Sequence, residues 1–220
     1  ISPEEIDLIL IGTVTPDMKT PSTAVIVQKA LGAKNAAAMD INAACVGFLY
    51  GLTTAKAFIE SGMYKTVLVV GVEVLTSITN YQDRTTCVLF GDGAGAAVLR
   101  RDDNANTGIL SAYIAADGSH TELLYVRAGG SRQKVTVENM NNGATGIYMN
   151  GSEIYKFAVR NMEDAAKRVI ADAGVSPEDI DLVIPHQANI RIIDSLAKRL
   201  HVSDEKLFVN IEDYGNTSSA

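Results

Sequence analysis

The sequence predicts an α/β protein in which a parallel or mixed β-sheet is covered by helices on both faces. Three observations support this prediction: strand and helix patterns alternate, glycines follow the helix patterns, and one strand-forming motif occurs twice. With 220 residues, of which 47% are hydrophobic, the chain is long enough for one large domain or two small ones.

The N-terminal part alternates apolar runs with segments of helical spacing. We expect strands at residues 7–14, 36–42 and 66–74 and helices at residues 21–31 and 47–61. Gly32 and Gly62 follow the two helices, where glycine commonly ends a helix. Residues 87–90 and 94–100 predict a strand or strand end, a tight Gly-rich loop and a second strand.

The C-terminal part is less regular. Residues 117–146 are polar and rich in Gly and Asn, which favours an irregular excursion over the surface. Residues 152–173 predict a long helix that carries Lys156, Arg160 and Lys167 on the side opposite its apolar residues.

A repeat links the two ends of the chain. Ser2-Pro-Glu-Glu-Ile-Asp-Leu-Ile-Leu10 recurs as Ser176-Pro-Glu-Asp-Ile-Asp-Leu-Val-Ile184, an offset of 174 positions (176 − 2). The same offset places residues 42–45 opposite residues 216–219. Coincidence is the alternative, since Ser-Pro-Glu-Glu is a common helix opening. We expect two duplicated α/β halves, residues 1–107 and 108–220, whose helix N-termini converge on one cleft.

Composition excludes several classes of function. A net charge of −7 argues against non-specific binding of nucleic acid, and no apolar run is long enough for a membrane span. The two cysteines suit a reducing cytosol, so we expect a cytoplasmic protein. The chain opens directly on a helix-start signal at Ser2 and stops soon after Asn216, which predicts a fragment.

Cys45 is the first candidate catalytic residue. It follows an apolar run in Met39-Asp-Ile-Asn-Ala-Ala-Cys45-Val-Gly-Phe, at the expected first turn of a helix. Free N–H groups and the helix dipole at that end favour a thiolate nucleophile. The alternative is a small buried apolar residue, which is the usual role of a free cysteine and the expected one for Cys87.

His186 and Asn216 are the other candidates. His186 follows an expected strand in Ile184-Pro-His-Gln-Ala-Asn189, the end at which open α/β sheets place their sites. Asn216 is the repeat counterpart of the Cys45 turn. A capping or core histidine and a helix N-cap asparagine are the alternatives. Papain-like proteases also order Cys, His and Asn in this way, but this chain lacks their local signature and has no Trp.

Four motifs together resemble the β-ketoacyl-acyl-carrier-protein synthase III family, the initiating condensing enzymes of bacterial type II fatty-acid synthesis. They are Asp40-Ile-Asn-Ala-Ala-Cys45-Val-Gly-Phe, Leu89-Phe-Gly-Asp-Gly-Ala-Gly-Ala96, Ile184-Pro-His-Gln-Ala-Asn-Ile-Arg191 and Gly215-Asn-Thr-Ser-Ser. They occur in family order, and the similarity covers essentially the whole chain. Elongating synthases resemble a Cys-His-His pattern instead, whereas this chain has Asn216 as its third member.

The resemblance implies a thiolase-like fold with α-β-α-β-α layers and a role for each candidate. Cys45 would take the acyl group from a short acyl-CoA, and its backbone N–H would contribute to the oxyanion hole. His186 and Asn216 would stabilise the enolate that forms when malonyl-acyl-carrier protein loses CO2. Each lost donor would cost about 2.7–4 kcal/mol. The resemblance implies no cofactor and no metal, with acyl-CoA as a substrate, and a homodimer.

Further contacts follow from the same resemblance. The carrier-protein segment is Gln187, Ala188, Asn189, Ile190 and Arg191, and the CoA contacts are Arg84, Ser152, Asn189 and Arg191. Arg191 and Lys198 lie on one side of a helix and, with the basic side of the long helix, predict a patch for the acidic carrier protein.

The chain departs from the family pattern in two ways. The family begins before Ile1 and continues well beyond Asn216, and it commonly has Phe where this chain has Thr20, which leaves the primer open. Two alternatives remain: another thiolase-like starter enzyme of the quinolone or polyketide type, and a non-catalytic module for dimerisation or carrier binding.

Overall fold

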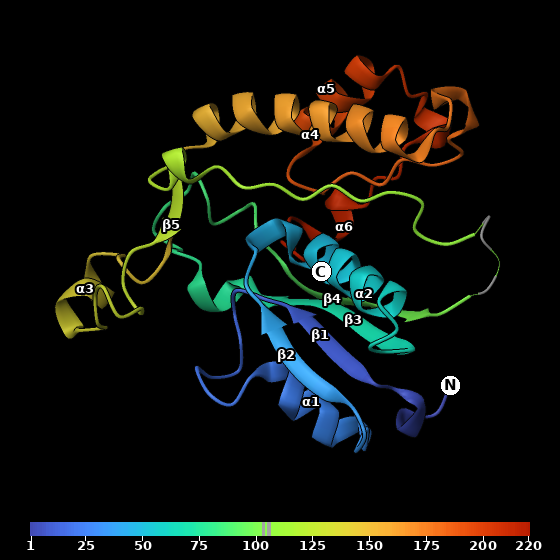
Figure 1. The fold of residues 1–220 in the computed structure, drawn as a ribbon. Helices are drawn as coiled ribbons and strands as arrows, with labels where there is room; N and C mark the ends of the chain where they lie inside the picture. The colour runs from blue at the N-terminus through green and yellow to red at the C-terminus, as the bar shows by residue number, and fades with distance from the viewer. Residues whose placement is uncertain (103, 105–106) are drawn as a thin grey trace. The chain divides into compact units, whose positions relative to one another are not determined.

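The chain folds into two compact units. The computed structural model describes residues 1–102, 104 and 107–220 (Figure 1). The first unit comprises Ile1–Glu73, Asp92–Ile114 and Thr217–Ala220, and the second comprises Val74–Gly91 and Ala115–Asn216. This division differs from the predicted halves because each unit takes in segments from both of them. The duplication of halves 1–107 and 108–220 stays a prediction.

Within the described residues, the first unit is built on a four-stranded sheet with the order β2-β1-β3-β4. Its elements are η1 (Pro3–Glu5), β1 (Leu8–Gly12), α1 (Thr23–Leu31), β2 (Ala37–Ile41), the 3-10 turn η2 (Ala44–Val46), α2 (Gly47–Glu60), β3 (Thr66–Val74) and β4 (Asp92–Arg100). β1 pairs in parallel with both β2 and β3. The predicted alternation of strands and helices is therefore confirmed.

β1 is the centre of the core because it is buried on both faces. Ile9 and Ile11 pack with Ala24 of α1, and Leu8 and Leu10 pack with Ala55 of α2 on the other face. Alternation of side chains along a strand explains this split. Helices α1 and α2 accordingly cover opposite faces of the sheet (Figure 1). A continuous apolar run is typical of a parallel strand covered on both sides.

Close backbone contacts join the carboxyl ends of the strands to the last residues of the chain. A Cβ atom added to Gly71 of β3 would lie 1.9 Å from the Ser219 carbonyl oxygen. A Cβ atom added to Gly12 of β1 would lie 2.6 Å from the Gly47 carbonyl carbon at the start of α2. Side chains at these two positions would push the segments apart.

The second unit combines helices with a short antiparallel hairpin of strands. Its elements are η3 (Leu75–Ile78), η4 (Gly118–His120), β5 (Leu124–Val126), α3 (Val137–Asn141), β6 (Ile147–Met149), α4 (Gly151–Ala173), η5 (Pro177–Asp179), α5 (Ile190–Leu200), η6 (Asp204–Lys206) and α6 (Ile211–Tyr214). Helix α4 confirms the long helix predicted at residues 152–173. In the described part of the chain, no helix combines the length and the apolar character needed to cross a membrane.

The structure corrects one local prediction and refines another. Residues 87–89 form a turn, because the Asp83 carboxylate accepts the Thr85 N–H at 2.9 Å and the Asp83 carbonyl accepts the Cys87 N–H at 3.0 Å. Phe90 makes only an isolated parallel bridge with Asn216. Strand β4 already begins at Asp92, so it includes the predicted Gly-rich loop. The segment 117–146 is not irregular throughout, since it contains η4, β5 and α3.

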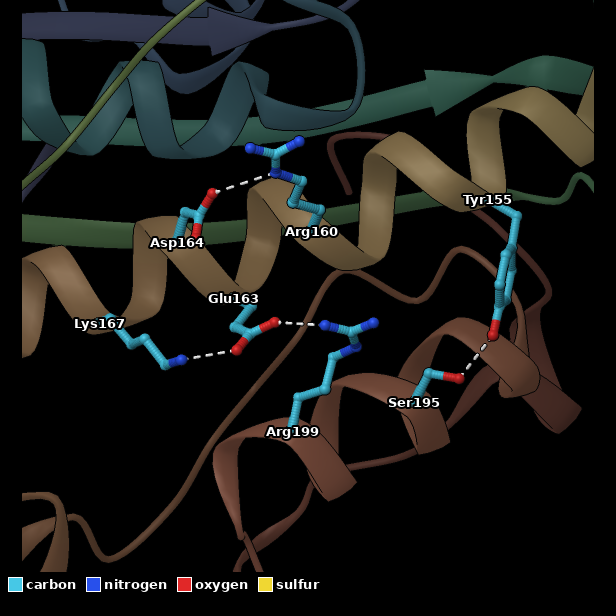
Figure 2. A network of polar contacts seen from close by, with 7 residues as sticks. All are labelled: Tyr155, Arg160, Glu163, Asp164, Lys167, Ser195 and Arg199. Atoms are coloured by element: carbon cyan, nitrogen blue, oxygen red, sulfur yellow. Dashed lines mark hydrogen bonds and ion pairs between the residues drawn. The ribbon is translucent and has the colours of Figure 1, made fainter.

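Polar contacts join α4 to α5 (Figure 2). The Glu163 carboxylate accepts hydrogen bonds from Lys167 at 2.6 Å and from Arg199 of α5 at 2.8 Å. Two turns earlier on α4 and one turn earlier on α5, the Tyr155 and Ser195 hydroxyl oxygens lie 2.6 Å apart. Glu163 thus connects the two helices through a shared carboxylate.

The predicted basic side of α4 is paired with acids of the same helix. Lys156 lies 2.8 Å from Glu153, Lys167 lies 2.6 Å from Glu163, and Arg160 lies 3.9 Å from Asp164. These exposed pairs neutralise much of the local positive charge. We therefore do not assign a carrier-binding role to this side of α4.

The contact at Gly71 yields a stability prediction. Gly71→Ala should lower the free energy of unfolding by about 3 kcal/mol, because the new methyl group would overlap the Ser219 carbonyl and shift the backbone. Gly95→Ala in β4 is the matched control, since its nearest neighbour is 4.0 Å from the added Cβ. Urea denaturation measures both; equal loss of stability in the two variants would contradict the prediction.

Glu163 yields a second prediction. The hydrogen bonds from Lys167 and Arg199 hold the pKa of Glu163 below its ordinary value of 4.5. A lowered pKa stabilises the fold above pH 4.5, and this contribution is lost as the pH falls. Glu163→Gln should therefore lower the urea midpoint at pH 7 more than Asp164→Asn does. The difference between the two variants should shrink below pH 4.5, and a gap that persists there would refute the prediction.

Candidate active site

Cys45 lies on the turn η2, between the end of β2 and the start of α2. Ala44 before it has a φ of 47°, a left-handed conformation that few residues other than glycine adopt. Strained backbone of this kind persists only where the surroundings hold it, and it is common at functional sites. Here the backbone at Gly47 packs closely against two other segments. A Cβ atom added to Gly47 would lie 3.2 Å from both Gly12 Cα and Ser219 Cβ. The half-buried Cys45 is thus fixed in place.

The charge environment of Cys45 contradicts the expected thiolate. Burial raises the pKa of the Cys45 thiol above its ordinary value, and the Glu73 charge raises this pKa further. A hydrogen bond with the Ser218 side chain and the backbone N–H of Cys45 act in the opposite direction. The prediction of a lowered pKa is therefore wrong for the free protein, because desolvation outweighs the donors at the helix end.

Glu73 is the central polar group of this part of the first unit. It is 1% exposed, on β3. Its carboxylate accepts hydrogen bonds from Thr15 Oγ1 at 2.7 Å, Val14 N–H at 3.1 Å, Ser218 Oγ at 3.2 Å and Thr13 Oγ1 at 3.3 Å, and it lies 3.1 Å from Ser219 Oγ. Glu73 was not among the residues predicted from the sequence. The available signal was a single acid within the apolar run Thr66–Val74.

The Cys45 turn and the Ser218 turn share an unusual backbone conformation. Ser218 has a φ of 56°, close to the 47° of Ala44, and the two residues are 174 positions apart (218 − 44). Ser2 and Ser176, at the same offset, each begin a 3-10 turn with a capping box. Residues separated by 174 positions therefore share local structure at these two places, although the counterpart of β1 is only an isolated bridge.

His186 lies in a loop of the second unit and not at the end of a regular strand. The expected strand is reduced to an isolated parallel bridge between Val183 and Leu207. Burial lowers the pKa of His186 to about 4 because it disfavours the charged imidazolium. The imidazole is consequently neutral at pH 7, and its ring carries one N–H donor.

Asn216 is buried, and its backbone is fixed against the Gly-rich segment of the second unit. Its N–H donates to the Leu89 carbonyl at 2.8 Å, and its carbonyl accepts from the Gly91 N–H at 3.0 Å. Gly215 before it has a φ of 70° and approaches the Leu89 carbonyl closely. The segment 89–91 therefore holds the backbone of Asn216.

The candidate residues are divided between the two units. Cys45 is grouped with Glu73 and Ser218 in the first unit. His186 and Asn216 belong to the second unit. A triad of Cys45, His186 and Asn216 therefore stays a prediction.

The expected carrier and CoA contacts differ in how their side chains are used. Gln187 is engaged within the protein, since it donates to the Pro185 carbonyl at 3.0 Å and accepts from Asn210 N–H at 3.0 Å. Asn189 caps α5 by accepting from Ile192 N–H at 3.0 Å. The side chains available at the surface are Arg84, Ser152, Ile190 and Arg191, whereas Ala188 is half-buried.

Across the described residues, no group of three His, Cys, Asp or Glu side chains is arranged to hold a metal ion.

Comparison with known proteins identifies the family. The family model for 3-oxoacyl-[acyl-carrier-protein] synthase III matches residues 39–118, and the model for the C-terminal part of that synthase matches residues 170–220. The chain is 52% identical over 220 residues to β-ketoacyl-[acyl-carrier-protein] synthase III of Caldanaerobacter subterraneus and covers 66% of that relative. It is 51% identical over 220 residues to the synthase of Clostridium acetobutylicum and covers 67% of it.

A solved structure gives the same result. The crystal structure of 3-oxoacyl-[acyl-carrier-protein] synthase III from Aquifex aeolicus matches the whole chain with a TM-score of 0.90 and 49% identity, and the chain covers 66% of it. The chain thus spans about two thirds of the length of the curated relatives it matches. Its fold is the thiolase-like α/β fold of these synthases, and the chain belongs to the β-ketoacyl-[acyl-carrier-protein] synthase III family.

Proposed function

We propose that the protein condenses a short acyl-CoA with malonyl-acyl-carrier protein through an acyl-Cys45 intermediate, and so starts fatty-acid synthesis. The observation that carries this proposal is the position of Cys45. It lies on a strained turn within residues 39–118, the segment matched by the family model. An unstrained turn would suffice for a cysteine that only fills space, so the strain supports a functional role.

The first half-reaction forms the thioester on the protein. The Cys45 sulfur attacks the carbonyl carbon of acyl-CoA, the bond from that carbon to the CoA sulfur breaks, and CoA leaves with the thiol proton. Backbone N–H groups at the turn are the proposed donors to the oxyanion. The conformation of Ala44 supports this role because it fixes the direction of the following backbone.

The second half-reaction joins two carbon atoms. Malonyl-acyl-carrier protein loses CO2, and the electron pair of the broken carbon–carbon bond forms an enolate. The enolate carbon attacks acyl-Cys45, and the carbon–sulfur bond of that thioester breaks. The Cys45 thiolate then takes a proton from solvent, and 3-oxoacyl-carrier protein is released. One proton is consumed over the whole cycle.

His186 and Asn216 are the proposed donors to the enolate oxygen. The low pKa of His186, about 4, supports this role because a neutral imidazole keeps an N–H without carrying a charge. Asn216 offers a neutral amide from a backbone held by two hydrogen bonds. Neutral donors that already point at the reacting oxygen stabilise the negative charge that develops on it, because the site does not have to reorganise during the reaction.

The remaining assignments are also proposals. Exposed Arg84, Ser152 and Arg191 are available for CoA, and Arg191 with Ile190 is available for the carrier protein. The rest of that segment would support the surface without contacting the carrier protein: Ala188 is half-buried, and Gln187 and Asn189 bond within the protein. We further propose a homodimer that needs no cofactor. A cytoplasmic location suits two free cysteines.

Acylation tests the proposed function directly. Incubation with radiolabelled acetyl-CoA should leave label on the protein after denaturation, and Cys45→Ala should retain none, a loss of at least about 100-fold. Cys87→Ala is the matched control, because Cys87 is the second free cysteine and lies in the other unit. Equal labelling of wild type and Cys45→Ala would contradict the proposal, as would the absence of label from wild type across a panel of acyl-CoA primers.

The pKa of His186 gives a pH prediction. Folding lowers this pKa from 6.5 to about 4, so its stabilising contribution is complete above pH 6.5 and is lost as the pH falls to 4. Over this range, wild type should lose about 3 kcal/mol more stability than His186→Gln. Urea unfolding at several pH values measures the difference. A constant difference between the two proteins across the range would show that His186 is not desolvated.

A further inference from the structure

The hydrogen bonds around Glu73 have a direct bearing on Cys45. The donors to the buried carboxylate are hydroxyl groups and a backbone amide, all of them neutral. Burying a charge is costly unless hydrogen bonds replace its lost hydration. The donors come from residues 13–15, which follow β1, and from the turn at residues 218–219, so the carboxylate fixes both segments.

Ser218 is the link between this carboxylate and the thiol. Its Oγ lies 3.2 Å from Glu73 Oε1, and its side chain also hydrogen-bonds with Cys45. A hydroxyl group has one proton and two lone pairs. When the Ser218 hydroxyl donates its proton to Glu73, it can only accept a hydrogen bond from the Cys45 thiol. When the same hydroxyl donates to the Cys45 sulfur, it stabilises the thiolate.

The neighbouring Ser219 has a different role. Its Oγ donates to the Gly12 carbonyl at 2.8 Å and lies 3.1 Å from Glu73 Oε1. The hydrogen bond that acts on Cys45 comes from Ser218, and the charged group that acts on Cys45 among the described residues is Glu73. The two serines therefore form a natural pair for comparison.

We infer that Glu73 is a positioning residue for Cys45, acting through the Ser218 hydroxyl. The carboxylate orients this hydroxyl so that Cys45 rests as a thiol. The Ser218 hydroxyl turns to the sulfur when the thiol proton leaves. In acyl transfer that proton goes to the departing CoA sulfur, while Ser218 keeps its own proton and only changes its acceptor. This inference rests on the proposed function in treating Cys45 as the nucleophile.

A resting thiol has a chemical consequence. Thiolates are oxidised and alkylated far more readily than thiols. A nucleophile that ionises only during reaction is protected between turnovers. This protection gives a reason for a buried acid whose charge acts on the proposed nucleophile.

The test is the pH dependence of Cys45 alkylation by iodoacetamide, followed by peptide mass spectrometry. Glu73→Gln should move the midpoint for Cys45 to lower pH by about one unit, because it removes a negative charge. Ser218→Ala should move the midpoint to higher pH, because the thiolate loses a donor. Ser219→Ala should leave it unchanged. Cys87, in the same samples, reports any general change in the protein.

The opposite directions of the two shifts separate this role from a structural one. Loosened packing would expose Cys45 and lower its midpoint in both variants. A midpoint for Ser218→Ala that is unchanged or lower, or a Ser219→Ala shift as large as that of Ser218→Ala, would overturn the inference. If Glu73→Gln does not fold, the alkylation midpoints of Ser218→Ala and Ser219→Ala still test the inference. Alkylation needs no acyl-CoA, so failed acylation with the expected shifts would refute the proposed function alone.

Discussion

The fold around the candidate nucleophile depends on one buried carboxylate. Glu73 lies at the end of β3, where parallel strands commonly place functional groups. Its charge is buried, so it must be surrounded by donors, and those donors come from segments far apart in the sequence. Because residues 13–15 and residues 218–219 satisfy the same group, neither segment can move without leaving part of a buried charge unsatisfied.

Glycine contacts add a second constraint to the same region. Because Gly12, Gly47 and Gly71 have no side chain, the backbones of β1, α2, β3 and the turn at residues 218–219 can pack in direct contact. Hydrogen bonds alone would tolerate small shifts, whereas atoms already in contact would not. Together these constraints hold Ala44 and Ser218 in a left-handed conformation that neither would adopt in isolation.

The regular elements of the first unit could be predicted because each depends on local patterns: the apolar run of β1, the helical spacing of α1 and the cap at Gly32. The turn at residues 87–89 was missed because contacts of one residue, Asp83, determine it. The expected strand before His186 is only a bridge, because a strand forms only where a neighbouring strand pairs with it. Cys45 and His186 were predicted from the sequence as site residues, but their pKa shifts come from burial, which local sequence does not specify.

The raised pKa of Cys45 changes how its position at a helix end is understood. A helix N-terminus next to an exposed cysteine would stabilise the thiolate in the resting protein as well as during the reaction. Here burial and the Glu73 charge outweigh the Ser218 hydroxyl and the Cys45 backbone N–H, so the pKa is raised and the thiol is favoured. In the proposed reaction, the donors remain in place for the thiolate that leaves the condensation product and for the oxyanion that precedes it. Their contribution is then largest when negative charge develops, which is the condition for accelerating the reaction and not only for binding the substrate.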